Sequence, residues 1–242
     1  MNPAALAWEQ FRFERRMFWR TPSAAFFNFV FPLLLLFLVA TAFATESDEL
    51  DILIPGVAAM SVMATTFTAL AHTFVFRREE GILKRVRGTP MPTTSYLAGM
   101  IGSSVLNAVV QVALVVAIGH LFYDVDWPHN WFLLGAFTAL GVVCFGALGI
   151  AFAHAIPNAD AAPAYENIVF LPLIFISGVF YSSDSLPRAL EAIAEVLPLK
   201  HLVDGLSIAI VGGSGDAAAA AAVVGGWAVA GMVLAVRFFR WT

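Results

Sequence analysis

The residues that could bind or move another molecule fall into three groups, and the first is the charged segment 77–92. Its sequence is RREEGILKRVRGTPMP, and it holds five of the 13 Lys and Arg residues between two long apolar stretches. Glu80 and Lys84 are spaced for an i,i+4 ion pair, and the Pro-rich stretch 89–92 ends a helix. Three apolar residues would share one face of that helix: Ile82, Leu83 and Val86. The segment therefore predicts a short amphipathic helix at a membrane surface, where a partner protein can bind.

The second group is a polar stripe within an apolar stretch: Ser61, Thr65, Thr68 and His72. At 3.6 residues per turn, this spacing places the four side chains within about 60° of arc on a helix. The stripe could line a transport path. The hydroxyls could equally bond to carbonyls of their own helix or to neighbouring helices, so both interpretations stay open. An ionisable group at the depth of His72 must be paired or hydrated.

A later apolar stretch offers further candidates for a path surface: Asn167, Phe170, Ile174, Ser177 and Tyr181. Aromatic and small residues of this kind suit an amphipathic or lipid-like molecule, although apolar packing alone would produce a similar set. Glu166 precedes them near the expected start of a helix, where an anion is stabilised by the helix dipole. Asn107 and Gln111, four residues apart, are interpreted as hydrogen-bonding to neighbouring helices.

Several kinds of catalytic site are excluded by what the sequence lacks. Neither Lys84 nor Lys200 follows a glycine, so the phosphate-binding loop of an ATPase is missing. The His-Glu-x-x-His pattern of zinc proteases is also missing, and the five His residues never fall at metal-ligand spacing. We expect no catalytic, cofactor-binding or metal site in this chain.

The elements that must position these residues are membrane-spanning helices. The 242 residues are 60% hydrophobic and 12% charged, far from the composition of soluble proteins. Apolar stretches of about 20 residues match a hydrocarbon layer of about 30 Å. We predict an all-α integral membrane domain over residues 1–242 with six spans: 24–45, 52–76, 95–122, 131–154, 164–181 and 216–236.

Two further segments and the orientation follow from charge and periodicity. Residues 1–22 carry a polar stripe beside aromatic bulk and predict an amino-terminal interfacial helix. Residues 182–215 hold two short amphipathic stretches, which predict an outer re-entrant helical hairpin. Eleven of the 13 Lys and Arg residues fall on one predicted side, so both termini should be cytoplasmic in the plasma (inner) membrane of a prokaryote.

The charged segment resembles the first cytoplasmic loop of ABC-2 type permeases, the membrane subunits of ATP-driven exporters. The matching residues are Arg78, Glu79, Gly81, Leu83, Lys84, Arg85, Arg87, Thr89 and Pro90. Two departures are an extra Glu80 and Ile82 in place of a more usual Thr. A second stretch, LPLIFISGVFYSSDSLPRALEAIAEVLPLKHLVDGL, resembles the fifth span and outer hairpin of the same family. With six spans, the resemblance extends over nearly the whole chain.

The resemblance implies a function that the residues alone do not establish. It makes segment 77–92 a coupling helix that docks on a separate ABC ATPase, with two ATPase copies binding ATP and Mg. It implies a second permease subunit, as a homodimer or as a heterodimer with a related permease, and a hydrophobic drug, antibiotic or lipid-like cargo. No nucleic acid is expected as a partner. The alternative is a membrane scaffold or assembly protein that moves no cargo. An ion-coupled carrier is disfavoured, because it would need buried acids and none of the 17 Asp and Glu residues lies in the middle of a predicted span.

Overall fold

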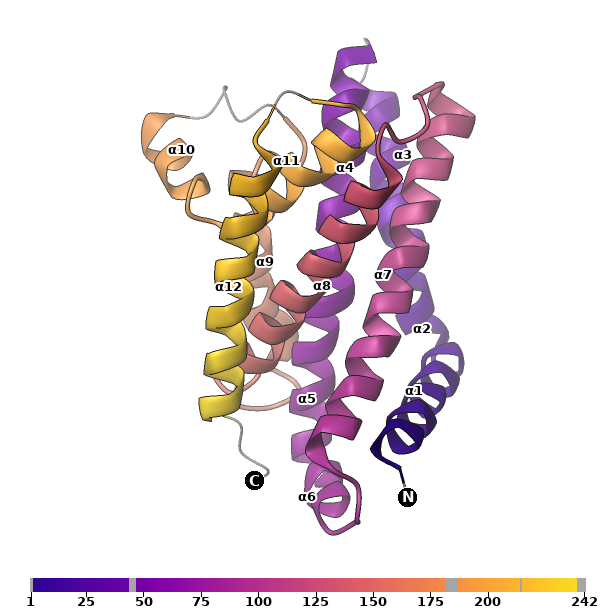
Figure 1. The fold of residues 1–242 in the computed structure, drawn as a ribbon, viewed down its shortest axis with the longest axis vertical. Coiled ribbons are helices and arrows are strands. Elements are labelled where there is room, and N and C mark those ends of the chain that lie inside the picture. Colours follow the sequence, from indigo (N-terminus) through magenta and orange to yellow (C-terminus); the bar gives the residue numbers. More distant parts are fainter. Residues whose placement is uncertain (1, 44–46, 182–186, 214, 239–242) are drawn as a thin grey trace.

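Long helices run side by side between two ends of the molecule, and shorter helices lie at each end (Figure 1). The computed structural model describes residues 2–43, 47–181, 187–213 and 215–238, and these contain helices and no strand. In chain order they are α1 (Pro3–Trp19), α2 (Pro22–Ala25), η1 (Phe26–Val30), α3 (Phe31–Phe43), α4 (Ser47–Met63), η2 (Ala64–Thr68), α5 (Ala69–Glu79), α6 (Ile82–Arg87), α7 (Thr93–Tyr123), α8 (Trp131–Phe152), α9 (Ala162–Ile176), α10 (Arg188–Ala194), α11 (Pro198–Ile210) and α12 (Ala217–Phe238).

Capping side chains set several of the helix starts. Asn2 accepts a hydrogen bond from the backbone N–H of Ala4, and Pro3 occupies the first turn of α1. Asn130 caps α8 through the N–H of Leu133 at 3.0 Å. Asp216 accepts from the N–H groups of Ala218 and Ala219 at the start of α12. These polar residues satisfy amide groups that have no partner within their own helices.

Four helices in the described part of the chain are long and apolar enough to cross a membrane, so this is a multi-pass membrane protein. They are Glu49–Glu79, Thr93–Tyr123, Trp131–Phe152 and Ala217–Arg237, with 31, 31, 22 and 21 residues. Two more apolar helices, Asn28–Ala42 and Ala162–Ile176, are shorter than the length expected for a full crossing.

The predicted spans differ most from the helices in two places. The predicted span 164–181 is too long, because α9 ends at Ile176 and Gly178 adopts a left-handed conformation with φ of 70°. Apolar residues continue past Ile176, so hydropathy alone does not locate the end of α9. The predicted span 24–45 contains the π-helical turn η1 directly before Pro32, a residue that cannot donate a helical hydrogen bond. Residues 44 and 45 of that span lie outside the described residues.

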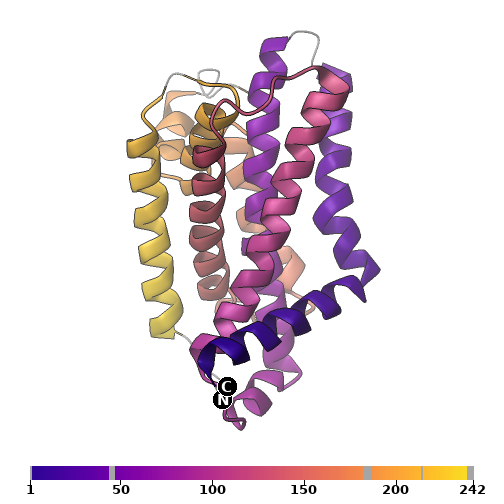
Figure 2. The same ribbon diagram turned by 45° about the vertical axis from the view of Figure 1, so that its right-hand side comes forward.

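The two ends of the molecule carry different elements. Helix α6 lies at one end, and α1 crosses the bundle obliquely near it (Figure 2). Helices α10 and α11 lie at the opposite end (Figure 1). The predicted segment 182–215 thus contains two helices, and Pro198 begins the second. We call these the α6 end and the α11 end; residues 182–186 and 214 lie outside the described residues.

Helix α8 is central to the packing. It contacts α12, α11, α7 and the α4–η2–α5 helix. Gly149 of α8 lies so close to the π-helical turn η2 that an added Cβ would fall 2.5 Å from the carbonyl oxygen of Phe67. Only a residue without a side chain permits this approach. A second cluster of buried residues at the α6 end joins α5, α6, α7 and α8, and includes Leu83 and Tyr96.

Candidate functional site

The charged segment 77–92 forms a helical corner at the α6 end. Helix α5 ends at Glu79, and Gly81 turns the chain with φ of 68° before α6 begins at Ile82. Such a positive φ is strained for residues with a Cβ, so glycine suits this position. Helix α6 ends at Arg87, in agreement with the short helix predicted from the sequence.

Two charged residues tie this corner to the loop between α8 and α9. The Arg78 guanidinium donates to the carbonyl oxygens of Ala153 at 3.1 Å, Ile156 at 2.5 Å and Pro157 at 3.2 Å. The Glu79 carboxylate accepts from the N–H of Ala159 at 2.7 Å. Charge-assisted bonds of this kind are stronger than neutral ones, so they hold the corner against this loop. These side chains are therefore engaged within the chain.

The remaining coupling candidates divide between a buried anchor and an exposed surface. Leu83 is buried in the cluster at the α6 end, with Val86 packed beside it. The exposed residues of the set are Glu80, Lys84, Arg85 and Arg87. We call these four residues the coupling surface. The predicted ion pair between Glu80 and Lys84 is wrong: Gly81 separates the two residues into different helices, and Arg85 instead donates to the Glu80 carbonyl oxygen at 2.9 Å.

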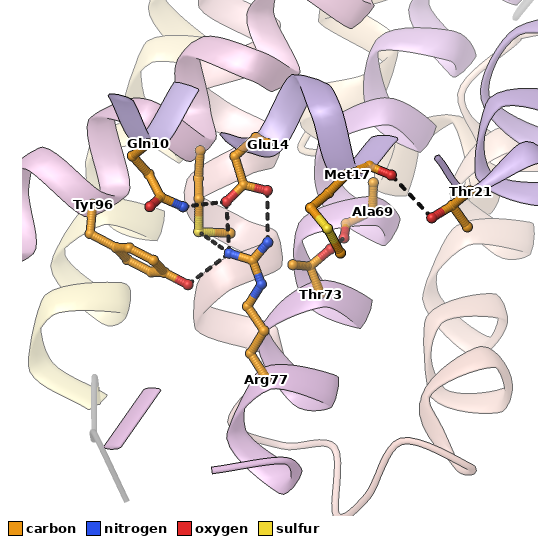
Figure 3. A network of polar contacts seen from close by, with 9 residues as sticks. Gln10, Glu14, Met17, Thr21, Ala69, Thr73, Arg77 and Tyr96 are labelled. Atoms are coloured by element: carbon orange, nitrogen blue, oxygen red, sulfur yellow. Dashed lines mark hydrogen bonds and ion pairs between the residues drawn. The ribbon is translucent and has the colours of Figure 1, made fainter. Parts of the chain in front are cut away.

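A buried ion pair links this corner to α1 (Figure 3). Arg77 donates to the two carboxylate oxygens of Glu14 at 2.8 and 2.7 Å, and also to the Tyr96 hydroxyl at 2.7 Å. Gln10 donates to the same carboxylate at 2.5 Å. The network joins α1, α5 and α7 around one guanidinium, so α1 is attached to the helix that leads into the coupling corner.

Sequence reasoning missed this network, although one signal pointed to it. Gln10 and Glu14 lie about 135° around the helix from the polar stripe of residues 9, 12, 16 and 20, among the bulky apolar residues of α1. Polar residues on an apolar face are buried with partners. The same helix places Arg15 against Asn107 of α7, in agreement with the predicted role of Asn107 as a bonding group between helices. Partial burial lowers the pKa of Arg15 from its ordinary value.

The polar stripe does not stay on one face. The π-helical turn η2 spans residues 64–68, and a widened turn rotates the residues on either side of it by about 100° relative to an uninterrupted helix. Ser61 and Thr65 are buried, Thr68 is partly buried, and His72 is exposed. The hydroxyls of the first three donate to carbonyls of their own helix, at 2.7 Å to Val57, 2.9 Å to Ser61 and 2.6 Å to Ala64, respectively.

The candidates in the later stretch are also separated. Asn167 is exposed and donates to the Pro163 carbonyl oxygen at 2.8 Å. Phe170 is partly buried and Ile174 is buried within α9, whereas Ser177 and Tyr181 follow its end. The hydroxyl of Ser177 is buried without a hydrogen-bond partner. The structure therefore places only Asn167, Phe170 and Ile174 on one helix.

One contact joins the two candidate stretches. His72 of α5 lies with its Nδ1 3.6 Å from the Oε1 of Glu166 on α9. Glu166 was expected at a helix start, but α9 begins at Ala162, so this residue follows the first turn. Its carboxylate is buried, beyond the positions where a helix dipole acts most strongly.

An apolar groove of about 380 Å³ lies elsewhere, between α7, α8 and α12. Its lining includes Leu97, Ile101, Ile150 and Met232, and contains none of the path candidates. The groove is thus separate from the pair formed by His72 and Glu166.

Comparison with known proteins gives a consistent set of similarities. The family model described as "ABC-2 type transporter" matches residues 5–211. The chain is 25% identical over 166 residues to the "Inner membrane transport permease YadH" of Escherichia coli (strain K12), covering 67% of this chain and 63% of the relative. It is 27% identical over 183 residues to the "Daunorubicin resistance ABC transporter permease protein DrrB1" of Streptomyces coeruleorubidus, covering 71% and 62%.

A third relative carries a resistance name as well. The "Linearmycin resistance permease protein LnrN" of Bacillus subtilis (strain 168) is 24% identical over 161 residues, covering 66% of this chain and 41% of the relative. The first relatives are matched over about 63% of their own length. The similarity therefore extends over most of this chain and over less than two thirds of those proteins.

Proposed function

The chain belongs to the ABC-2 type transporter family, and from this premise we propose that it is the permease subunit of an ATP-driven exporter. The observation that carries the proposal is the coupling corner, in which exposed basic side chains lie on a short helix whose other face is anchored by Leu83. A separate ABC ATPase would bind this surface and would supply the sites for ATP and Mg. The chain itself acts as the moving gate.

The proposed topology has six spans with both termini in the cytoplasm. The short helices α3 and α9 would be the remaining two spans, in addition to the four long helices. The charge distribution supports this orientation, because basic residues concentrate in α1, in segment 77–92 and at the end of α12, whereas the hairpin contributes Arg188 and Lys200. The α6 end would then face the cytoplasm, and α10 and α11 would lie at the outer surface.

The proposed coupling has two steps that different residues perform. Lys84, Arg85 and Arg87 bind the ATPase, because their charges are exposed and available for ion pairs across an interface. Arg78 and Glu79 pass the displacement to the loop before α9, through the bonds to backbone groups described above. Rotation of the corner would thereby shift α5 and α9 together.

The proposed assembly is a pair of permeases on a pair of ATPase subunits. The second permease is either another copy of this chain or a related one. The cargo is a hydrophobic drug, antibiotic or lipid-like molecule, a class supported by the resistance names of two relatives and by the apolar character of the helices.

Orientation is tested by cysteine labelling, because Cys144 is the single cysteine and is buried. In a Cys144→Ala background, Thr89→Cys near α6 and Asp126→Cys between α7 and α8 both place a thiol at an exposed position. A membrane-impermeant maleimide should label Asp126→Cys in intact cells and Thr89→Cys only after permeabilisation. The reverse pattern would refute the orientation.

Partner binding is tested by co-purification with each ABC ATPase subunit from the same genome. Arg85→Glu and Arg87→Glu should lose the ATPase because they reverse charges on the coupling surface. Arg16→Glu is the matched control, since Arg16 is an exposed base on α1, outside that surface. Equal retention of the ATPase by all variants would contradict the assigned docking site.

A further inference from the structure

We propose that Glu166 and His72 form a binding site for the cationic group of an amphipathic cargo molecule. The site rests on the proposed transport function but concerns the chemical class of the cargo, a lipophilic amine. The geometry that points to it is a buried carboxylate on α9 beside a half-exposed imidazole on α5.

The carboxylate is incompletely satisfied. The Glu166 side chain is 10% exposed, and its Oε1 has no hydrogen-bond partner within the described residues. The Nδ1 of His72 lies 3.6 Å from this oxygen, beyond ordinary hydrogen-bond length. A buried carboxylate without a full set of donors is costly and favours an added cation or donor.

The other charged groups on α5 and on the loop before α9 bond to other residues or are exposed. On α5, Arg77 pairs with Glu14, and Arg78 donates to carbonyl groups of the loop before α9. Glu79 accepts from the N–H of Ala159 on that loop, and Asp160 is exposed there. His154, at the end of α8, lies with its Nδ1 3.1 Å from the Ile150 carbonyl oxygen. His72 is thus the one described side chain that ion-pairs with Glu166, and it does so only when protonated.

The surroundings suit the apolar body of an amine. The His72 side chain is 49% exposed, so the pair is reached from the outer surface of the α5–α9 contact. Each helix carries an aromatic residue one turn beyond the pair: Phe76 is exposed on α5, and Phe170 is partly buried on α9. Because α5 runs toward the α6 end and α9 runs away from it (Figure 1), the two residues lie on opposite sides of the pair along the helices. Aromatic side chains bind the apolar part of a ligand and also stabilise a nearby ammonium group. A charged head at Glu166 and an apolar body beside these rings therefore define a lipophilic amine.

Charge balance explains why an amine fits better than a neutral molecule. With neutral His72, the pair carries one buried negative charge, and the ammonium group of the cargo neutralises it. With protonated His72, the imidazolium already occupies that role and competes with the cargo. Neutral or anionic molecules of the same shape do not neutralise the Glu166 carboxylate, so the site selects molecules by their charge.

The test is direct binding of a matched pair of fluorescent probes to the full chain. Dansylcadaverine carries a primary ammonium group, and its N-acetyl derivative keeps the same apolar body without the charge. The purified protein is placed in phosphatidylcholine nanodiscs, and empty nanodiscs report partition into lipid. The wild type should prefer the amine about tenfold, the scale of one favourable partly buried charge contact.

Two variants should abolish this preference for opposite reasons. Glu166→Gln removes the negative charge, whereas His72→Lys supplies a permanent internal cation that occupies the carboxylate. Asp160→Asn is the control, because it removes an exposed acid only six residues from Glu166. Folded Glu166→Gln or His72→Lys protein that keeps the tenfold preference would overturn the proposal, as would equal binding of both probes by the wild type.

The assay also separates this proposal from the function on which it rests. Probe binding requires no ATPase and no transport, so a chain that discriminates the amine but never pumps would refute only the transport proposal. A chain that pumps neutral cargo and binds both probes equally would refute only the amine site.

Discussion

Removing the Glu14 carboxylate should destabilise the protein more than any exposed charge change. Glu14 and Arg77 are 12% and 11% exposed, and two short bonds join them (Figure 3). Breaking a buried pair by removing one partner costs about 3–5 kcal/mol, because the other charge is left uncompensated. Tyr96 still accepts from Arg77, so we expect Glu14→Gln to lie near the lower value, roughly 3 kcal/mol.

This loss converts into a measurable change in melting temperature. For a chain of this size, 1 kcal/mol corresponds to roughly 2–4 °C, so Glu14→Gln should lower the Tm by about 6–12 °C. Cys144 is fully buried and reacts with a thiol-sensitive fluorophore only after unfolding, which provides the assay without any added label. Arg16→Gln, on the exposed side of α1, is the matched control and should shift the Tm by less than about 2 °C.

A double-mutant cycle decides whether the ion pair itself is responsible. Glu14→Gln combined with Arg77→Gln removes both charges and should recover a large part of the lost stability, since no charge is left buried alone. A Glu14→Gln Tm within 2 °C of the wild type would refute the reasoning. Strictly additive effects of the two substitutions would do so as well.

Three further predictions concern single positions. Gly81→Ala should lower the free energy of unfolding by about 1–2 kcal/mol, and Gly81→Asn by less, because Asn tolerates the left-handed conformation. Unfolding measurements in which the Asn variant is less stable than the Ala variant would contradict the assigned turn. Gly149→Ala should lower the free energy of unfolding by about 1–3 kcal/mol, because the added Cβ clashes with the Phe67 carbonyl oxygen. Gly225→Ala, in open space on α12, is the control and should not lower it. Equal Tm values for the two variants would contradict the close packing at Gly149. Ser61→Ala should change the free energy of unfolding by no more than about 1 kcal/mol and leave transport unchanged, because the Ser61 hydroxyl bonds to its own helix. Loss of transport would instead indicate that Ser61 lines the transport path.

The elements of the coupling corner were predictable because their signals are local. Gly81, the apolar residues of α6 and the Thr-Pro ending are close together in the sequence, and each acts on its own turn of helix. The helical character of the long apolar stretches follows in the same way from composition. The family resemblance, carried by the same local residues, agrees with the family model that matches residues 5–211.

Features that depend on distant partners were not predictable from the pattern. Arg77 and Glu14 are 63 positions apart, so no local spacing joins them. The pair of His72 and Glu166 likewise requires α5 and α9 to lie side by side. The π-helical turn η2 carries no distinct periodicity, and it changes which of the residues from Ser61 to His72 share a face. The end of α9 depends on backbone conformation at Gly178 rather than on hydropathy.

The most direct test of the account is ATP-driven transport by the reconstituted complex. The chain and its ATPase would be placed in inside-out proteoliposomes, with daunorubicin, the drug in the name of one relative, and a neutral hydrophobic dye as alternative cargoes. Uptake should require ATP and the ATPase, and Arg85→Glu should reduce it to the level of empty vesicles while Arg16→Glu transports normally. Full uptake without the ATPase, or undiminished uptake by Arg85→Glu, would contradict the claim that this chain is a gate moved through its coupling surface.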